Sequence, residues 1–308
     1  MNSQKTRRVQ NPFGLASLGV SLLVLFLFLS ASYGWSGSRE LRILHLNDFH
    51  GFAEPYEPFG SKERLGGMAH LASTVERLRS EKPTLLLAAG DMIQGNNWAN
   101  LFRGASSIEL MNLMRFDAMV LGNHEFDFGK RILQRRIREA DFPVLGSNVR
   151  GLDGIKEYAV LERGGLRLGI LGVVTEDTPV STSPKNVVGI EFLSAAETIA
   201  RSLPELRKKA DIVLVLSHLG YHQDRILAEK IKGIQVIVGG HSHTRLNKPT
   251  LVQDTLIVQA WEHGKALGVL DLTIEDGAIL QWEGRLEEIR ADQGEEDPRV
   301  KDLVHRFS

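Results

Sequence analysis

The strongest constraint on the fold is a repeated alternation of short apolar segments with longer amphipathic ones. The apolar segments have the composition of buried strands, and the amphipathic ones carry apolar residues at helical spacing. Strand and helix alternation with short connections is typical of a wound α/β fold. The expected strands are 41–46, 84–89, 119–121, 144–145, 168–174, 212–216 and 236–238, and the expected helices are 67–80, 106–114, 130–140, 194–209 and 223–230.

The C-terminal part of the sequence has a different pattern. Residues 255–259, 267–274 and 281–289 read as three consecutive strands, and Glu275-Asp276-Gly277 has the composition of a hairpin turn. We therefore expect a second, partly antiparallel sheet. The sequence predicts one catalytic domain over residues 35–290, followed by a tail, 291–308, that is first acidic and then helical from 298 to 307.

Composition narrows the classes of function. The 308 residues suffice for one large α/β domain with a sizeable core. A net charge of -1 provides no general basic field, so we expect no nucleic acid partner, and an anionic substrate must be attracted locally, for example by metal ions. The absence of cysteine excludes disulfides, zinc–thiolate sites and a thiol nucleophile. A metal ion must therefore be held by histidine, carboxylate or amide oxygen.

The N-terminal segment, residues 1–34, has the layout of a secretory signal. Basic Lys5, Arg7 and Arg8 precede an apolar stretch over residues 13–29, and small residues follow it. The alternative is an uncleaved membrane anchor, although the stretch is shorter than the ~20 residues that a spanning helix needs. We expect export to the periplasm or cell envelope, with a mature chain that begins near Trp35 and meets the membrane only through this segment.

Metal-capable side chains recur just past the carboxyl ends of the expected strands. Open α/β sheets place their functional sites at that edge. Glycine precedes several of these side chains and allows the backbone to bend sharply after a strand. The segments are Asp48-Phe49-His50-Gly51, Gly90-Asp91, Gly122-Asn123-His124-Glu125-Phe126-Asp127, Ser217-His218 and Gly240-His241-Ser242-His243.

Each segment alone has an ordinary structural explanation. An aspartate after a strand often caps a helix or a turn, and a single histidine is more often a surface or core residue than a ligand. Together the segments favour a metal site, because half of the 10 histidines fall in them. Of the others, His45 lies in an expected strand and His70 in an expected helix. His222, His263 and His305 lack a comparable setting and are left out, although His222 and His263 could line a cleft.

In their order, these segments resemble the motifs of the calcineurin-like metallophosphoesterases: D-x-H, G-D, G-N-H-E/D, a strand-end histidine and G-H-x-H. The longer forms over residues 46–51 and 122–127 resemble the 5′-nucleotidase branch, which includes UDP-sugar hydrolases and 2′,3′-cyclic nucleotide phosphodiesterases. The resemblance extends over residues 41–289. It implies an α/β/β/α sandwich of two sheets and a single catalytic domain.

The resemblance also implies two divalent metal ions and their ligands. Paired ions clamp a phosphoryl group and lower the pKa of a bound water, which gives a hydroxide that attacks phosphorus. Mixed nitrogen and oxygen ligands fit Mn, Zn, Fe or Co better than Mg or Ca, and ligand type does not choose among those four. One ion would take Asp48, His50 and His243, the other would take Asn123, His218 and His241, and Asp91 would bridge them.

His124 and Asp127 are the expected catalytic pair. The family uses the histidine that follows the asparagine ligand against the phosphate and the leaving oxygen, oriented by the aspartate three residues further on. A carboxylate on one imidazole nitrogen fixes the tautomer and favours a ring that can donate a proton. The alternative for Asp127 is an N-cap for the helix over 130–140.

The expected function is metal-dependent hydrolysis of phosphate esters, with nucleotides as the substrates and nucleotide catabolism as the setting. A phosphodiesterase of cyclic nucleotides or nucleotide sugars and a metal-binding scaffold without turnover are the alternatives, and the complete ligand set favours an enzyme. Larger members of the branch carry a second, base-stacking domain, which we expect to be absent because the chain stops at Ser308. Substrate-binding residues and oligomeric state stay unassigned, and Trp98, Phe102 and Arg103 either help a substrate or pack a loop.

Overall fold

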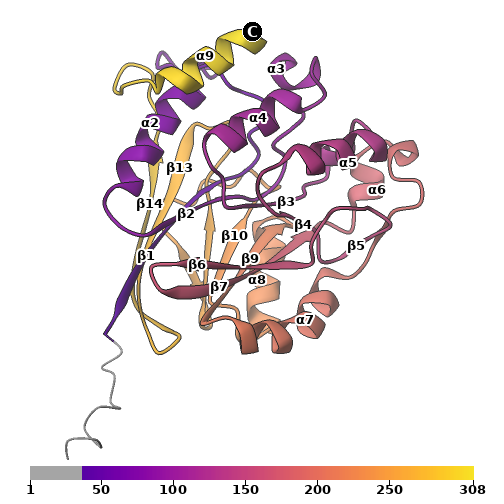
Figure 1. Cartoon of the computed structure of the whole chain (residues 1–308), viewed down its shortest axis with the longest axis vertical. Coiled ribbons are helices and arrows are strands. Elements are labelled where there is room, and N and C mark those ends of the chain that lie inside the picture. Colours follow the sequence, from indigo (N-terminus) through magenta and orange to yellow (C-terminus); the bar gives the residue numbers. More distant parts are fainter. Residues whose placement is uncertain (1–36) are drawn as a thin grey trace, which may run out of the picture. The chain divides into compact units, whose positions relative to one another are not determined.

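Two β-sheets form the centre of the molecule in the computed structural model, which describes residues 37–308 (Figure 1). The predicted signal or anchor lies outside the described residues. The first sheet has the order β14-β13-β1-β2-β3-β4, and the second has the order β11-β12-β10-β9-β7-β6. The strands of the first sheet are β1 (Arg39–Leu46), β2 (Thr84–Ala88), β3 (Ala118–Val120), β4 (Val144–Leu145), β13 (Ala266–Glu275) and β14 (Ala278–Glu288). Those of the second are β6 (Tyr158–Arg163), β7 (Leu166–Val174), β9 (Ile212–His218), β10 (Val236–Gly239), β11 (Thr250–Val252) and β12 (Thr255–Gln259), and β5 (Val149–Arg150) pairs separately with β8 (Glu191–Phe192).

The central strands of both sheets are parallel. In the first sheet β1, β2, β3 and β4 run in one direction, and in the second β7, β9, β10 and β12 do so. Antiparallel strands occupy the edges: β13 and β14 beside β1, β6 beside β7, and β11 beside β12. The carboxyl ends of the parallel strands within each sheet therefore lie along one edge, where α/β proteins place their sites.

Apolar side chains from both sheets meet between them. Ile43 and Leu85 of the first sheet and Ile170 and Leu214 of the second are fully buried in one cluster. Helices cover the outer face of each sheet, and their apolar residues form two further clusters with the strands. The predicted α/β/β/α sandwich is therefore confirmed. The first sheet is covered by α2 (Met68–Arg79), α4 (Ala105–Leu113), α5 (Lys130–Glu139) and α9 (Pro298–Phe307), and the second by α7 (Ala195–Lys209) and α8 (Tyr221–Lys230).

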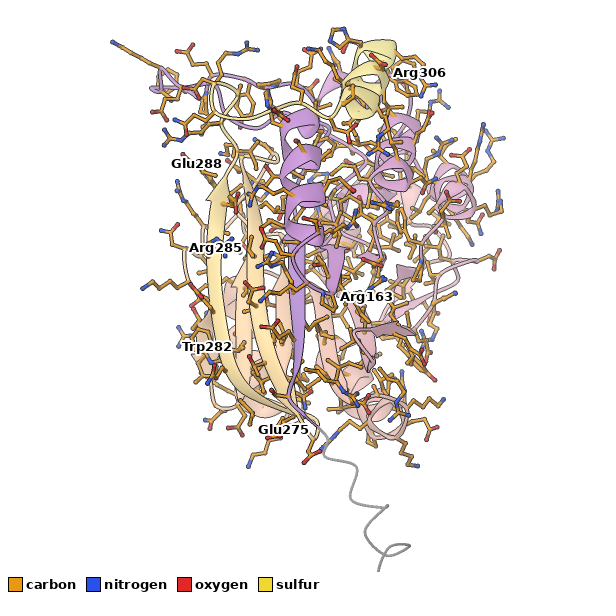
Figure 2. The ribbon with its side chains drawn as sticks, turned by 60° about the vertical axis from the view of Figure 1, so that its left-hand side comes forward. Arg163, Glu275, Trp282, Arg285, Glu288 and Arg306 are labelled. Carbon is orange, nitrogen blue, oxygen red and sulfur yellow. The ribbon has the colours of Figure 1, made fainter. Side chains whose placement is uncertain are left out.

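The expected second, partly antiparallel sheet is present, since β11 and β6 pair antiparallel within it. The three C-terminal strands are divided between the two sheets, because β12 pairs in parallel with β10 in the second sheet while β13 pairs antiparallel with β1 in the first. The hairpin between β13 and β14 is confirmed, and Asp276 and Gly277 have φ angles of 49° and 77°, as a type I′ turn requires. Figure 2 shows this hairpin with Glu275 at its turn and Trp282, Arg285 and Glu288 along the exposed edge strand.

The last helix packs on the sandwich. Figure 1 shows α9 beside α2, and its buried residues Val300, Leu303 and Val304 join the core cluster of the first sheet. The Trp98 indole donates to the carbonyl of Val304 at 3.1 Å, and Phe307 lies edge-on to Phe102. Trp98 and Phe102 therefore pack a loop rather than face a substrate. Among the described residues, no helix is both long and apolar enough to cross a bilayer.

Candidate metal centre

The carboxyl ends of five parallel strands of the two sheets, with the segments that follow them, meet at one place. All seven side chains predicted as metal ligands lie there. The Nε2 atom of His243 is 3.2 Å from Oδ1 of Asp48, and Nε2 of His218 is 3.1 Å from Oδ2 of Asp91. The Nδ1 atom of His241 lies 3.0 Å from Oδ1 of Asn123. Residues that are far apart in the sequence thus present nitrogen and oxygen donors to one small volume.

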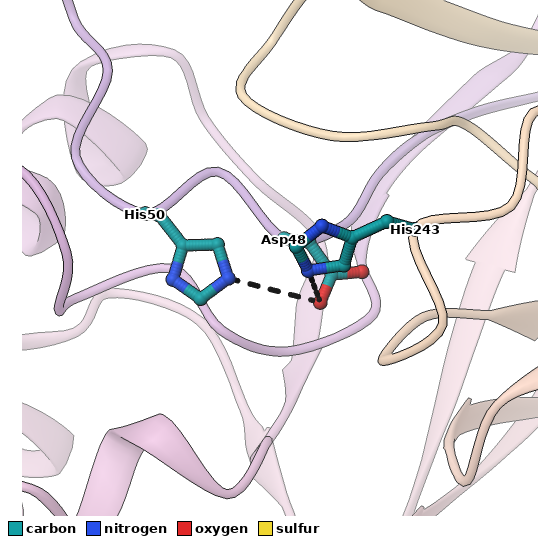
Figure 3. A group of neighbouring side chains, drawn as sticks. All are labelled: Asp48, His50 and His243. Atoms are coloured by element: carbon teal, nitrogen blue, oxygen red, sulfur yellow. Dashed lines mark ion pairs between the residues drawn. The ribbon is translucent and has the colours of Figure 1, made fainter.

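The donors form two adjacent groups. In the first, Asp48, His50 and His243 place one donor atom each within 4.8 Å of one another, and Figure 3 shows both histidine rings directed at the same Asp48 oxygen. The second group consists of Asp91, His218 and His241, to which Asn123 adds its amide oxygen. These are the sets expected for two ions.

Asp91 lies between the two groups. Its Oδ2 atom is 3.8 Å from Nε2 of His50 in the first group and 3.1 Å from Nε2 of His218 in the second. A carboxylate in this place can offer oxygen to both sides, which is the bridging position that the family resemblance implies for it.

The ring orientations fit cations. The Nδ1 atoms of His50 and His218 lie 3.0 and 2.7 Å from the backbone carbonyls of Gln94 and Ala89. Since a carbonyl oxygen only accepts, each ring carries its proton on Nδ1 and directs the Nε2 lone pair into the cluster, unless the ring is fully protonated. The Nε2 atom of His218 is buried and makes no well-aligned hydrogen bond, although Oδ2 of Asp91 lies 3.1 Å away, as expected for two donor atoms directed at one metal ion.

The electrostatics of the cluster also favour bound cations. Although burial opposes it, the carboxylates of Asp91 and Asp48 raise the pKa of His218 to about 10. Contact with Asp48 raises the pKa of His243 to about 9. The carboxylates therefore favour positive charge in this cluster, which divalent cations would also supply.

Unusual backbone angles bring these side chains together. Five of the predicted ligands have left-handed φ angles between 50° and 73°, a region that residues other than glycine seldom adopt. Each such residue costs on the order of 1–3 kcal/mol, and such strain is concentrated at functional sites. A left-handed residue turns the chain abruptly after the strand, so that side chains two positions apart can face one centre. The five are Asp48, His50, Asp91, His241 and His243.

Two glycines allow the ligand loops to touch. A Cβ atom on Gly122 would lie 2.2 Å from Oδ1 of Asp91, and one on Gly90 would lie 2.4 Å from Nδ1 of His218. No larger residue fits at either position without moving a predicted ligand.

Glu125 fixes the backbone of two ligand loops. Its buried carboxylate accepts hydrogen bonds from the amides of Asp91, Met92, Ile93 and Gly122. Burial and the nearby Asp91 carboxylate raise the pKa of Glu125 to about 7, while these hydrogen bonds act in the opposite direction. The sequence-based prediction gave Glu125 no role, although its place in the Gly-Asn-His-Glu motif was the available signal.

Glu262 orients a predicted ligand from outside the cluster. Its Oε2 atom pairs with Nδ1 of His243, and its Oε1 atom accepts from the Lys265 ammonium at 2.6 Å. A carboxylate behind a metal-binding histidine fixes the ring and increases its basicity. No sequence pattern indicated this contact, because Glu262 lies outside every motif and meets His243 only in the folded chain.

The predicted catalytic pair is also in place. Nδ1 of His124 lies 2.7 Å from Oδ2 of Asp127. This hydrogen bond raises the pKa of His124, and burial opposes the rise. Asp127 does not cap α5, because Gly129 is the N-cap residue and the helix has no side-chain cap. The capping alternative is therefore wrong, and Asp127 faces the histidine.

An open cavity of about 430 Å³ leads to the cluster. His263, which the sequence-based prediction left out, lines it beside Phe52 and His124. The Phe52 ring stacks on His263 with centroids 3.9 Å apart, and the Tyr56 hydroxyl lies 3.0 Å from Nδ1 of His263. A fixed imidazole thus forms part of the cavity wall.

Comparisons with known proteins agree with this geometry. Residues 41–245 match the family model described as calcineurin-like phosphoesterase. A snake venom 5′-nucleotidase from Crotalus adamanteus is 32% identical over 89% of this chain and 53% of its own length, and the Homo sapiens 5′-nucleotidase is 32% identical over 88% and 53%. The crystal structure of a 5′-nucleotidase precursor from Thermus thermophilus superposes with a TM-score of 0.81 at 35% identity, over 87% of this chain and 58% of that one. The chain thus spans about half the length of the curated relatives it matches.

Proposed function

The chain belongs to the calcineurin-like phosphoesterase family, and on this basis we propose that it is a metal-dependent hydrolase of phosphate esters with nucleotides as its substrates. The observation that carries the proposal is the convergence of all seven predicted ligands and the His124–Asp127 pair at one open cavity. A scaffold without turnover would need neither the pair nor access from solvent. Nucleotides are proposed because relatives at 32–35% identity are named 5′-nucleotidases.

Seven side chains would hold two divalent cations, of which Mn, Zn, Fe and Co suit the mixed donors. When bound, such cations supply Lewis acidity and activate water as the nucleophile. The groups that would hold them are fixed by the protein itself, because Glu125 accepts from the Asp91 and Gly122 amides and Glu262 pairs with the His243 ring. In this proposal Asp48, His50 and His243 serve one cation, Asn123, His218 and His241 serve the other, and Asp91 serves both.

His124 would act on the leaving group. Its Nδ1 faces Asp127, so its Nε2 is free for substrate, and the ring lines the cavity. Asp127 favours the protonated ring, which can donate from Nε2 to the ester oxygen as the bond between phosphorus and that oxygen breaks. The bond electrons stay on the departing oxygen, the proton neutralises it, and water supplies the new oxygen on phosphorus.

We also propose that the protein is exported. The support is the basic, apolar and small-residue order of residues 1–34. N-terminal sequencing of extracellular or envelope fractions would identify a mature chain that starts near Trp35. Protein found only in the cytoplasm would contradict export, and Met1 retained on a membrane-bound form would favour the anchor.

The test of function uses the purified protein stripped by chelation and then supplied with Mn, Zn, Fe or Co. Hydrolysis of AMP, UMP, a nucleotide sugar, a 2′,3′-cyclic nucleotide and an aryl phosphate is measured with each metal. We expect negligible rates without metal, recovery with at least one metal, and the highest kcat/KM on a nucleotide. Asp91→Asn, which weakens the contact shared by both cations, should remain inactive under all conditions. Full activity after complete metal removal would refute the proposal.

A further inference from the structure

Both carboxylate oxygens of Asp127 are occupied. Oδ2 accepts from Nδ1 of His124 at 2.7 Å, and Oδ1 accepts from the Thr182 hydroxyl at 2.5 Å. The Asn186 amide donates to the Asp127 backbone carbonyl at 2.7 Å. Two side chains from a distant loop thus hold the residue that orients His124.

The loop that carries these contacts is itself tied to the metal centre. It follows β7, where the Thr175 amide donates to the carbonyl of His218 at 3.0 Å. Thr178, which starts the short helix α6 (Thr178–Ser181), is fully buried and donates its hydroxyl to Thr175 at 2.6 Å. The Thr182 amide then donates to Thr178 at 3.0 Å. These hydrogen bonds fix the position of Thr182 relative to Asp127.

We propose that Thr182 is a positioning residue for the His124–Asp127 pair. The aspartate carboxylate rotates readily about its last torsion, which has no sharp staggered minima. A hydroxyl that donates to Oδ1 removes this freedom and keeps Oδ2 on the imidazole. Because a carboxylate has no proton, Thr182 must be the donor. Its 9% exposure leaves little water to replace it.

The proposal rests on the proposed function and refines it. With Asp127 fixed, the His124 ring is held with Nε2 toward the leaving oxygen, and its proton can move to that oxygen as the ester bond breaks. A leaving group whose alcohol or phenol has a low pKa departs without proton donation, whereas a ribose or alkyl oxygen needs a proton from His124. Loss of the Thr182 hydroxyl should therefore slow substrates with poor leaving groups more than those with good ones.

The experiment compares Thr182→Val, which keeps the shape and loses the donor, with Thr182→Ser, which keeps the donor. Rates are measured on AMP, phenyl phosphate and 4-nitrophenyl phosphate in the metal-loaded protein. For Thr182→Val we expect kcat on AMP to fall about 10-fold, part of the 10²–10⁴ assigned to proton transfer, with KM little changed and a much smaller loss on 4-nitrophenyl phosphate. Thr182→Ser should restore the wild-type dependence on the leaving group. Metal content and melting temperature of each variant are measured alongside.

A double-mutant cycle separates positioning from a general structural effect. On the Asp127→Asn background, Thr182→Val should add little, because the carboxylate that it orients is already lost. Val180→Ala, at an 83% exposed position in the same loop, is the control and should match the wild type.

A loss that is equal for all three leaving groups, that is additive with Asp127→Asn, or that is absent would overturn the assignment of Thr182. A wild-type protein without metal-dependent hydrolysis would overturn the proposed function, and this inference with it. Because the wild type is measured first, the two failures are distinguishable.

Discussion

The carboxylate of Glu125 accepts a hydrogen bond from the backbone amide of Asp91 at 2.8 Å, across the boundary between two ligand loops. The same carboxylate oxygen accepts from Gly122 at 2.5 Å, next to the predicted ligand Asn123. One buried side chain therefore sets the distance between the proposed bridging carboxylate and the loop that carries Asn123 and His124. The site depends on this residue although it would touch neither cation.

Glu125→Gln should disturb the two loops that carry the predicted ligands Asp91 and Asn123. Glutamine keeps the size but replaces one accepting oxygen with an NH₂ group, which then faces backbone N–H donors. Leaving such donors unsatisfied costs about 1–3 kcal/mol. We expect a lower melting temperature, measured by calorimetry, and fewer than two metal ions per chain, measured by elemental analysis of the purified protein. Glu57→Gln, at an exposed position, is the control, and wild-type metal content in Glu125→Gln would contradict the role.

Glu262→Gln should lower the affinity for one of the two cations without changing the fold. The carboxylate pairs with Nδ1 of His243, and outer partners of this kind are worth roughly 10–100-fold in metal affinity. We expect a weaker affinity for one of two ions by about that factor, with activity recovered at high metal concentration. Metal titration followed by activity and by calorimetry checks this. An unchanged titration would show that Glu262 does not tune His243.

His124→Ala should keep the wild-type metal content and have a lower kcat. The ring is not in either donor group, and general acid help contributes roughly 10²–10⁴-fold to turnover. Asp127→Asn should give a milder loss, because the imidazole remains. The two rates and the metal content are measured on the same samples. If metal content fell together with rate, His124 would be a ligand instead.

The sandwich and the cluster of donor side chains could be predicted from the sequence for a physical reason. Buried strands such as β9 and β10 are nearly continuous apolar runs, and the polar residues His218 and His241 stand out at their ends. Strand order could not be reached in the same way, because β12 and β13 are equally apolar and nothing local decides which sheet each joins.

The residues that support the ligands were also beyond sequence reasoning. Glu262 and Thr182 act through contacts with His243 and Asp127 that exist only after the chain has folded. Left-handed backbone at His50 and His243 is equally hidden, since local sequence favours it strongly only for glycine, and asparagine, aspartate and histidine adopt it in a small minority of positions. Tertiary contacts impose these angles.

His263→Ala should affect substrate binding more than metal. The ring lines the cavity, stacked on Phe52 and bonded to Tyr56, so its removal opens the wall and leaves that hydroxyl without its partner. We expect kcat/KM to fall about 10-fold, mainly through KM, which is the signature of a lost ground-state contact. Metal content should stay at the wild-type value. A loss confined to kcat would assign His263 to the chemical step.

His45 should make stability depend on pH. It lies in β1 with its ring against Gly268 and its Nδ1 atom buried without a partner, and burial lowers its pKa to about 3. In the unfolded chain its pKa is about 6.5. Between these two pH values His45 is protonated in the unfolded state and neutral in the folded state. Its contribution to the free energy of unfolding is therefore complete above about pH 6.5 and decreases as the pH falls toward 3.

The size of this effect follows from linkage. For His45 alone the loss at pH 5, relative to neutral pH, is about 2 kcal/mol, since each unit below the unfolded pKa costs about 1.4 kcal/mol. His45→Gln places a side chain that does not titrate at the same position. Urea unfolding of the metal-loaded proteins at pH 7.5 and pH 5 should therefore show a smaller decrease for His45→Gln than for the wild type, whatever the variant's absolute stability. Comparing the two decreases cancels the contribution of the other titrating groups, including the ligand histidines, because both proteins share them. Equal decreases would mean that His45 is protonated in the folded protein, which the apolar contacts of β1 do not allow without rearrangement.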